Sequence, residues 1–132
     1  MELNATSKKI LIVDDDQTML QSLEQRLKSW GFAVLTAKTG EEALHQAQEH
    51  SPNLVLLDIM LPRMKGRELC AKLKENASTA NVPVIFLTAL GLPDHIRAGM
   101  NLGAEDYLVK PFEPETLRQR IDLCLKRHEP SS

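Results

Sequence analysis

The chain has 132 residues, of which 42% are hydrophobic and 26% charged, a composition typical of a single soluble globular domain. Its 16 basic and 18 acidic residues give a net charge of −2, which argues against a nucleic-acid-binding surface. The apolar runs are too short to span a bilayer, and the amino end lacks the apolar region of a signal peptide. We therefore expect a soluble, cytoplasmic protein that binds neither nucleic acid nor membrane.

Short apolar runs alternate with longer amphipathic stretches along the chain. The apolar runs predict strands at residues 10–13, 32–37, 54–58, 83–88 and 106–110. They are rich in β-branched residues and apolar on both faces, as buried parallel strands are. Each strand is followed by apolar residues at helical spacing. The first helix is predicted to begin after Asp16 and end at Gly31, and Thr39 and Glu42 have the spacing of a capping box at the second.

This alternation predicts one α/β domain, a doubly wound (βα)5 fold with a parallel sheet and helices on both of its faces. We expect the domain to span residues 8–127, with a flexible segment at 1–7 and a tail or the start of a linker at 128–132. In such sheets the ligand site lies beyond the carboxyl ends of the strands. The second strand ends in Ala37, which fits an edge strand away from the site.

Polar side chains gather at the carboxyl ends of the other four predicted strands. They are Asp14, Asp15 and Asp16 after the first strand, Asp58 at the third, Thr88 at the fourth and Lys110 at the fifth. Neighbouring carboxylates repel each other unless a cation neutralises them, and magnesium prefers oxygen ligands. An ammonium and a hydroxyl can bind phosphate oxygens, while a remaining carboxylate can attack phosphorus. The set predicts magnesium-assisted phosphoryl transfer to an aspartate.

The order and spacing of these residues resemble the signature of response-regulator receiver domains, the chemotaxis-regulator-like modules of two-component signal transduction. The matching motifs are Asp14-Asp15, Asp58, Thr88-Ala89 and Lys110-Pro111-Phe112, together with the whole stretch 103–112. The resemblance covers about residues 8–127. It implies the flavodoxin-like receiver fold with strand order 2-1-3-4-5 and a cis peptide bond before the proline.

The resemblance also implies a chemical role for each site residue. Asp58 would accept a phosphoryl group from the phosphohistidine of a sensor histidine kinase or phosphotransfer protein, and Lys110 would pair with Asp58 at rest. Mg²⁺, or Mn²⁺ in its place, would be held by Asp14, Asp15 and Asp58, with Asp14 acting through water. The backbone carbonyl of Met60 would be a further ligand.

Two more residues would carry the signal outward. The resemblance implies that Thr88 moves toward the phosphoryl oxygen and that Tyr107 swings inward behind it. The face made by the fourth helix, the fifth strand and the fifth helix would then change shape and control a partner or output domain. The sequence leaves open whether the chain forms a homodimer. The chain would be a signalling phosphoacceptor and not an enzyme acting on other substrates.

Two apolar residues distinguish this chain. Met60 and Leu90 stand two positions after Asp58 and Thr88. In the resembled family these positions flank the phosphoryl group and often carry polar groups that influence the hydrolytic water. We hypothesise that apolar side chains here slow hydrolysis and give a long-lived phosphorylated state.

Three alternatives to a phosphoacceptor receiver remain open at this point. Asp14-x-Asp16-x-Thr18 after an apolar strand is similar to the first motif of haloacid-dehalogenase-type phosphatases, in which Asp14 would be the nucleophile and Asp16 the acid/base. The short chain and the lack of an acidic pair after Lys110 argue against it. A pseudo-receiver is disfavoured by the full set of site residues, and a flavodoxin-like binding module by the lack of a Gly- and Ser/Thr-rich loop after the first strand.

The cysteines and histidines suggest no second site. Cys70 and Cys124 fall far apart in predicted helices, and we identify no CxxC pair and no Cys/His ligand spacing. We expect both to be reduced packing residues. The histidines show no convergent spacing and are interpreted as surface residues: His45, His50, His95 and His128.

Overall fold

The computed structural model describes residues 8–58, 66–88 and 104–128. Its elements are β1 (Lys9–Val13), α2 (Gln17–Ser29), β2 (Ala33–Ala37), α3 (Gly40–His50), β3 (Leu54–Asp58), α4 (Gly66–Glu75), β4 (Val84–Thr88), β5 (Asp106–Val109) and α6 (Pro114–Arg127). The helix expected after β4 lies outside the described residues, as do the segments 1–7 and 129–132.

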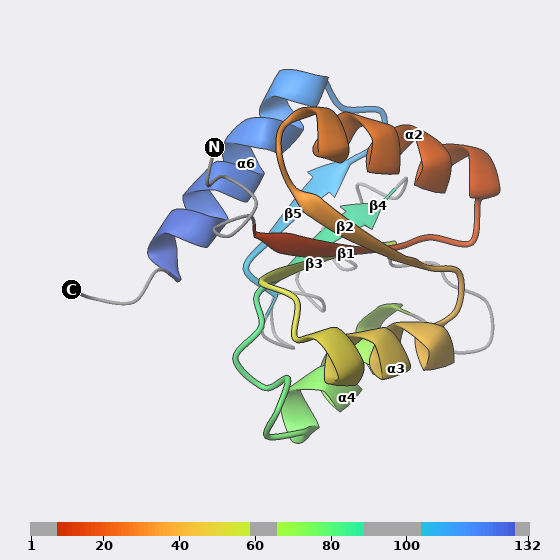
Figure 1. Cartoon of the computed structure of the whole chain (residues 1–132), viewed down its shortest axis with the longest axis vertical. Coiled ribbons are helices and arrows are strands. Elements are labelled where there is room, and N and C mark those ends of the chain that lie inside the picture. The colour runs from red at the N-terminus through yellow and green to blue at the C-terminus, as the bar shows by residue number, and fades with distance from the viewer. Residues whose placement is uncertain (1–7, 59–65, 89–103, 129–132) are drawn as a thin grey trace.

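The strands form one parallel sheet in the order β2-β1-β3-β4-β5 (Figure 1). This confirms the predicted doubly wound topology, in which the chain reverses direction across the sheet between β1 and β3. Among the residues that the structure describes, β2 pairs only with β1, and the first four residues of β2 are exposed or half-buried. The expectation that the second strand is an edge strand is therefore confirmed.

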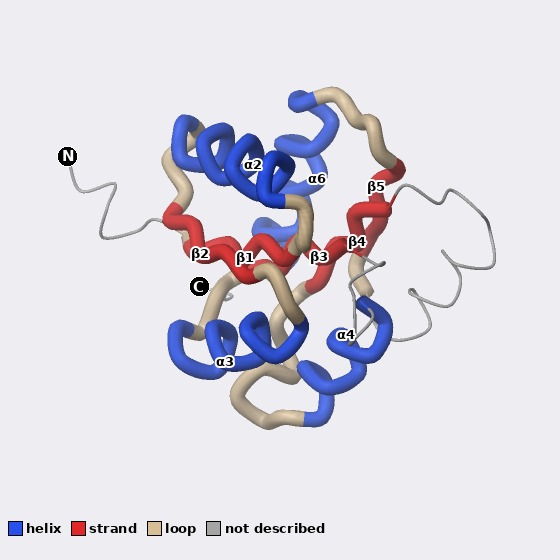
Figure 2. Tube along the Cα trace, turned by 90° about the vertical axis from the view of Figure 1, so that its right-hand side faces the viewer, coloured by secondary structure: helices blue, strands red, loops and turns tan. Residues whose placement is uncertain are grey.

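The sheet is the middle of three layers. Figure 2 shows α2 and α6 on one face and α3 and α4 on the other. Side chains of β1 alternate between these layers, as strand geometry requires. Ile10 and Ile12 pack in the α2/α6 layer, whereas Leu11 and Val13 pack in the α3/α4 layer. All residues of β3 and β4 are buried, which explains why their sequences are apolar without alternation.

The helix ends form as their sequences predict. Asp16 caps α2 by accepting hydrogen bonds from the backbone N–H groups of Thr18 and Met19 at 3.0 and 3.3 Å. After this helix the chain turns at Gly31, whose φ of 96° favours glycine. At α3, the Thr39 hydroxyl accepts from the Glu42 N–H at 3.1 Å. The Glu42 carboxylate accepts in return from the N–H of Lys38, one residue before the cap.

Four strand boundaries differ by one residue from prediction, because β1 begins at Lys9 and because Phe32, Pro83 and Lys110 fall just outside their strands. The Phe32 N–H donates to the carbonyl of Leu27 at the end of α2 instead of joining the sheet. Pro83 accepts a hydrogen bond from Val55 but has no N–H to donate in return. Shifts of this size are normal at element ends.

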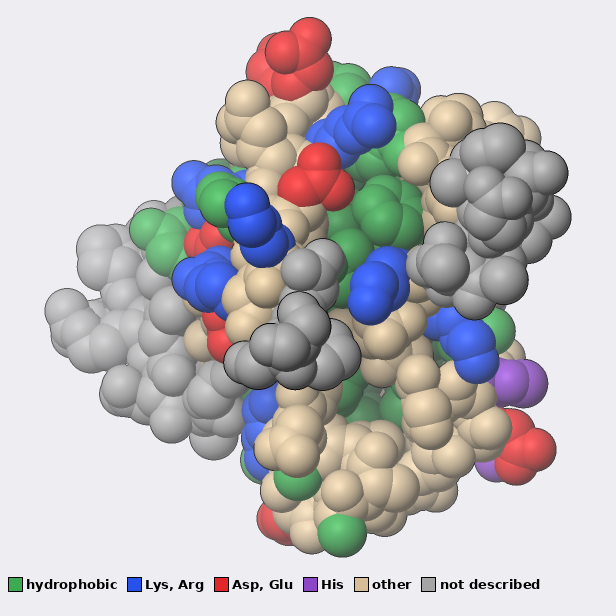
Figure 3. Space-filling model, turned by 60° about the vertical axis from the view of Figure 1, so that its left-hand side comes forward, with side chains coloured by type: hydrophobic (Ala, Val, Ile, Leu, Met, Phe, Trp, Pro, Cys, Tyr) green, Lys and Arg blue, Asp and Glu red, His purple; other side chains and the backbone are tan. Residues whose placement is uncertain are grey.

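The surface agrees with the near-neutral charge of the sequence. On the face drawn in Figure 3, lysine and arginine side chains lie among acidic and hydrophobic ones. Within the three described ranges, no helix has both the length and the hydrophobicity needed to cross a membrane.

The two cysteines are packing residues on opposite faces of the sheet. Cys70 lies in the α3/α4 layer and Cys124 in the α2/α6 layer, both fully buried and not joined by a disulfide. Burial raises the pKa of the Cys70 thiol. Burial, reinforced by the carboxylate of Glu105, raises the pKa of Cys124 from 9.0 to about 11.

Both thiols are therefore expected to resist alkylation in the folded chain. The thiolate is the reactive form, so the raised pKa of Cys124 alone should slow its reaction about a hundredfold. As pH rises above 9.0, the unfolded chain releases thiol protons that the folded chain keeps, so stability should fall. Thiol labelling with a chelator present, with and without urea, checks the first effect. Rapid labelling of the folded chain would contradict it.

Candidate functional site

The carboxyl ends of the strands meet at one edge of the sheet. The register pairs Val13 with Leu57, Asp58 with Leu87 and Thr88 with Val109. Residues that end or directly follow these strands are consequently neighbours in space. The site residues predicted on β1, β3, β4 and β5 share one edge for this reason.

Lys110 lies between two carboxylates. Its Nζ is 3.0 Å from Asp14 Oδ2 and 3.6 Å from Asp58 Oδ2. The expected contact with Asp58 is present, but Asp14 is the nearer partner. Asp14 is only 1% exposed and Asp58 9%, so the carboxylate with less access to water has the shorter contact with the cation. The Lys110 backbone N–H donates to the carbonyl of Thr88 at 2.7 Å, which holds the lysine beside the end of β4.

Three carboxylates converge beside this lysine. Oxygens of Asp14, Asp15 and Asp58 lie within 4.8 Å of one another, with Asp14 buried and Asp15 exposed. The Asp14 Oδ1 accepts from the Asp16 N–H at 2.9 Å, which fixes this carboxylate in place. Three negative charges against one ammonium leave an excess of two. An all-oxygen set with this charge fits a hard divalent cation, and the pocket is consistent with a divalent-metal site.

For the other predicted site residues the structure gives burial or backbone geometry, and two of them lie outside the described residues. The Thr88 side chain is buried at the end of β4, and Tyr107 in β5 is half-buried against the α3/α4 layer. The peptide bond between Lys110 and Pro111 is cis, as the resemblance implied. Met60 and Leu90 lie outside the described residues.

Asp16 does not take part in the acidic pocket. Its side chain is exposed and caps α2, and the carboxylates that converge are those of Asp14, Asp15 and Asp58. The phosphatase alternative needs Asp14 and Asp16 to act as a nucleophile and acid/base pair. The position of Asp16 instead supports its interpretation as a helix cap.

A second cluster was missed by the sequence analysis. Glu105, Cys124 and His128 bring a carboxylate oxygen, a sulfur and a ring nitrogen within 4.8 Å of one another. The statement that no Cys/His ligand spacing exists was therefore wrong. Cys124 and His128 are four residues apart, a spacing that puts two side chains on one helix face. His45, His50 and His128 are not buried, as expected, while His95 lies outside the described residues.

Comparisons with known proteins show the family and the fold of the chain. Residues 10–122 match the family described as "Response regulator receiver domain". A crystal structure of a putative response regulator from Chloroflexus aurantiacus is 40% identical, with a TM-score of 0.87, and covers 92% of this chain and 99% of that one. The chemotaxis protein CheY4 of Vibrio cholerae is 32% identical, with a TM-score of 0.86, and covers 89% and 98%.

Curated relatives are longer proteins. The chain is 47% identical over 130 residues to a "Probable transcriptional regulator ycf27" of Cyanophora paradoxa, covering 98% of this chain and 52% of that protein. It is 40% identical over 123 residues to the "Alkaline phosphatase synthesis transcriptional regulatory protein PhoP" of Bacillus subtilis, covering 93% and 50%. The chain thus spans about half the length of the curated relatives it matches. By its family match, its fold and its site, the chain belongs to the response-regulator receiver domains, the signalling phosphoacceptors of two-component systems.

Proposed function

We propose that Asp58 is the phosphoryl acceptor and that Asp14, Asp15 and Lys110 make its pocket reactive. The observation that carries this proposal is the convergence of three carboxylates with the ammonium of Lys110 at the carboxyl edge of the sheet. A receiver domain implies a histidine kinase as its partner. We infer that the donor is a phosphohistidine on such a kinase or on a phosphotransfer protein.

The transfer we propose exchanges one bond to phosphorus for another. A carboxylate oxygen of Asp58 forms the new bond as the bond to the donor imidazole nitrogen breaks, and the electron pair stays with that nitrogen. Lys110 neutralises charge on the phosphoryl oxygens and is already within 3.6 Å of Asp58. The hydrogen bond from the Asp16 N–H holds Asp14 while Lys110 shifts toward the incoming group.

Mg²⁺ is the cation that fits best, and Mn²⁺ is an acceptable substitute. Asp14, Asp15 and Asp58 would hold it, with the Met60 carbonyl as a further ligand. When bound, it would neutralise the acidic pocket and the phosphoryl oxygens. The three carboxylates support this assignment because they are all hard oxygen donors.

We infer that Thr88 and Tyr107 transmit the effect of phosphorylation to the surface of the domain. The two residues lie on adjacent strands, where Phe86 and Thr88 of β4 pair with Tyr107 and Val109 of β5. A shift of the Thr88 side chain toward a phosphoryl group would vacate space beside β5 that the half-buried Tyr107 can enter. The surface affected would include β5, α6 and the helix expected after β4, and it would control a partner protein or an output domain, with homodimerisation as one route.

Chemical phosphorylation tests this function without the cognate kinase. Acetyl phosphate with Mg²⁺ should add one phosphoryl group per chain, detected by intact mass, and a chelator should prevent the addition. Beryllofluoride with Mg²⁺ should change the environment of the single tyrosine, Tyr107. A chain that accepts no phosphoryl group from acetyl phosphate and does not respond to beryllofluoride would contradict the proposal.

The apolar residues Met60 and Leu90 lead to a kinetic prediction. Met60→Asn combined with Leu90→Glu should accelerate loss of the phosphoryl group about tenfold, because polar groups can orient the attacking water. A tenfold change corresponds to about 1.4 kcal/mol in the activation barrier. The decay of isolated phosphoprotein measures the rate. An unchanged lifetime would show that these residues do not control hydrolysis.

A further inference from the structure

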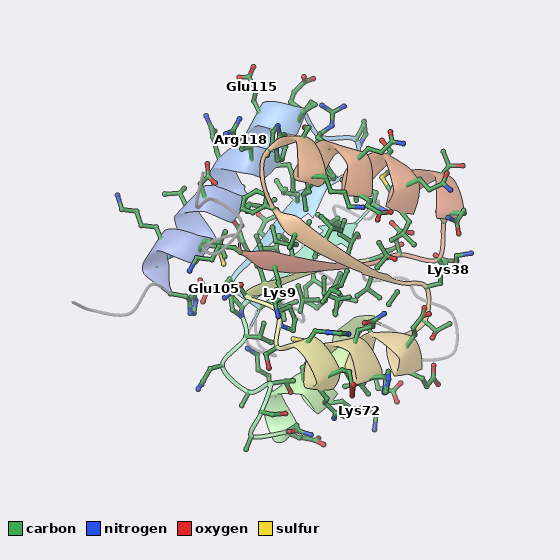
Figure 4. All side chains as sticks on the ribbon, viewed as in Figure 1. Lys9, Lys38, Lys72, Glu105, Glu115 and Arg118 are labelled. Atoms are coloured by element: carbon green, nitrogen blue, oxygen red, sulfur yellow. The ribbon has the colours of Figure 1, made fainter. Side chains whose placement is uncertain are left out.

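A cluster of oxygen, sulfur and nitrogen atoms that could bind a metal lies at the amino ends of the strands, opposite the acidic pocket at their carboxyl ends. Glu105 directly precedes β5, so it lies at the amino ends of the strands. Figure 4 labels Glu105 near Lys9 at the start of β1, whereas Lys38, which follows β2, is at the other edge. The cluster of Glu105, Cys124 and His128 is therefore separate from the proposed phosphorylation site.

Two different parts of the fold build this cluster. Cys124 lies in the last turn of α6, and His128 is the residue that ends the helix. The spacing of four residues aligns the two side chains, as in the helical metal-binding pairs of other proteins. Packing of α6 on the sheet then places both beside Glu105, which is fixed by a backbone hydrogen bond from its N–H to the carbonyl of Val84.

His128 and Glu105 are in direct contact, and the sulfur of Cys124 lies within 4.8 Å of both. His128 Nε2 lies 3.0 Å from Glu105 Oε1, and the other Glu105 oxygen is 3.6 Å from a guanidinium nitrogen of Arg127. Cys124 Sγ is within 4.8 Å of both ligand atoms and fully buried, while His128 is exposed. His128 also lines an open cavity of about 310 Å³, so solvent reaches the cluster on the His128 side.

We propose that Glu105, Cys124 and His128 form a zinc-binding site. Thiolate, imidazole and carboxylate are the three ligand types that zinc combines, and magnesium and calcium do not favour sulfur or nitrogen. Three protein ligands leave the fourth tetrahedral position to water, which can approach from the side of the exposed His128. A thiolate and a carboxylate balance the two charges of the ion, and the thiol proton is released to solvent on binding.

Without a metal, the same side chains form a histidine–carboxylate pair above a buried thiol. Zinc affinity distinguishes the two possibilities, because a metal site loses affinity when any one of its three donors is removed. Removing His128, which is exposed, should not disturb folding, so its variant gives a clear result even if a variant of the buried Cys124 is unstable.

The test is zinc titration of the whole chain against a chromogenic chelator in excess Mg²⁺, which competes for the acidic pocket. We expect one zinc ion per chain, with affinity lowered about 100-fold or more in His128→Gln and Glu105→Gln, since even an indirect partner of a metal ligand is worth about 10- to 100-fold. His45→Gln, a change at another histidine of the surface, should bind zinc like the original chain, and so should Asp58→Asn.

Cobalt gives a second readout. Bound Co²⁺ should show a thiolate-to-metal charge-transfer band that disappears in Cys124→Ser and persists in Cys70→Ser. Absence of zinc binding, equal affinity in His128→Gln and His45→Gln, or loss of zinc in Asp58→Asn would each overturn the proposal. Phosphoryl acceptance at Asp58 is tested separately, by phosphorylation with acetyl phosphate.

Discussion

Asp58→Asn is expected to abolish phosphorylation of the chain by acetyl phosphate and Mg²⁺. The amide oxygen of asparagine is a poor nucleophile and carries no negative charge, so the acyl phosphate cannot form. The substitution also removes one of the three carboxylates that lie within 4.8 Å of each other, which should weaken metal binding. Intact mass measures the first effect and metal titration the second.

Asp16→Asn is the matched control. Asp16 is exposed and caps α2, and asparagine is an equally good cap residue, so both folding and phosphorylation should be retained. If Asp58→Asn were still phosphorylated while Asp14→Asn or Asp16→Asn were not, the acceptor assignment would be wrong. The phosphatase-type arrangement of Asp14 and Asp16 would then need to be reconsidered.

Lys110→Met should destabilise the metal-free chain by about 3 kcal/mol. The variant keeps most of the side-chain length but removes the ammonium that lies 3.0 Å from the buried carboxylate of Asp14 and 3.6 Å from that of Asp58. Breaking a buried ion pair on one side costs about 3–5 kcal/mol, and the lower end fits a lysine side chain that is 18% exposed. Urea unfolding in a chelator measures the loss, and added Mg²⁺ should restore part of it.

Two further variants show whether the loss of stability in Lys110→Met comes from the loss of its positive charge. Lys38→Met changes an exposed lysine near the same edge of the sheet and should alter stability by no more than about 0.5 kcal/mol. Asp58→Asn removes a negative charge from the crowded pocket and should stabilise the metal-free chain. Equal losses in Lys110→Met and Lys38→Met would show that Lys110 does not neutralise the pocket.

The topology was predictable because each buried strand is a short apolar run that ends in a polar residue or is directly followed by one. β3 is the clearest case, since Leu54–Asp58 was predicted with the bounds that the structure shows. The strand ends at Phe32 and Pro83 were less predictable. Their assignment depends on hydrogen-bond partners in a neighbouring element, which single-sequence periodicity does not reveal.

The sequence predicted those site residues that end a strand or directly follow one. Four strand termini and the order of the sheet predict the convergence around Lys110. The sequence does not tell which carboxylate lies nearest that lysine, because relative burial of Asp14 and Asp58 depends on packing. Glu105, Cys124 and His128 were overlooked because docking of α6 brings Glu105 to the other two, although the spacing of Cys124 and His128 was a usable signal.

The Lys110–Asp14 contact joins positions 96 apart in the sequence, and this has a consequence for biosynthesis. The acidic side chains leave the ribosome early, but the lysine that neutralises them arrives only after β5 has been translated. A nascent chain that ends before β5 has the aspartates without the pocket, and so should be no substrate for the kinase. Signalling competence would then begin only once translation has delivered the last strand.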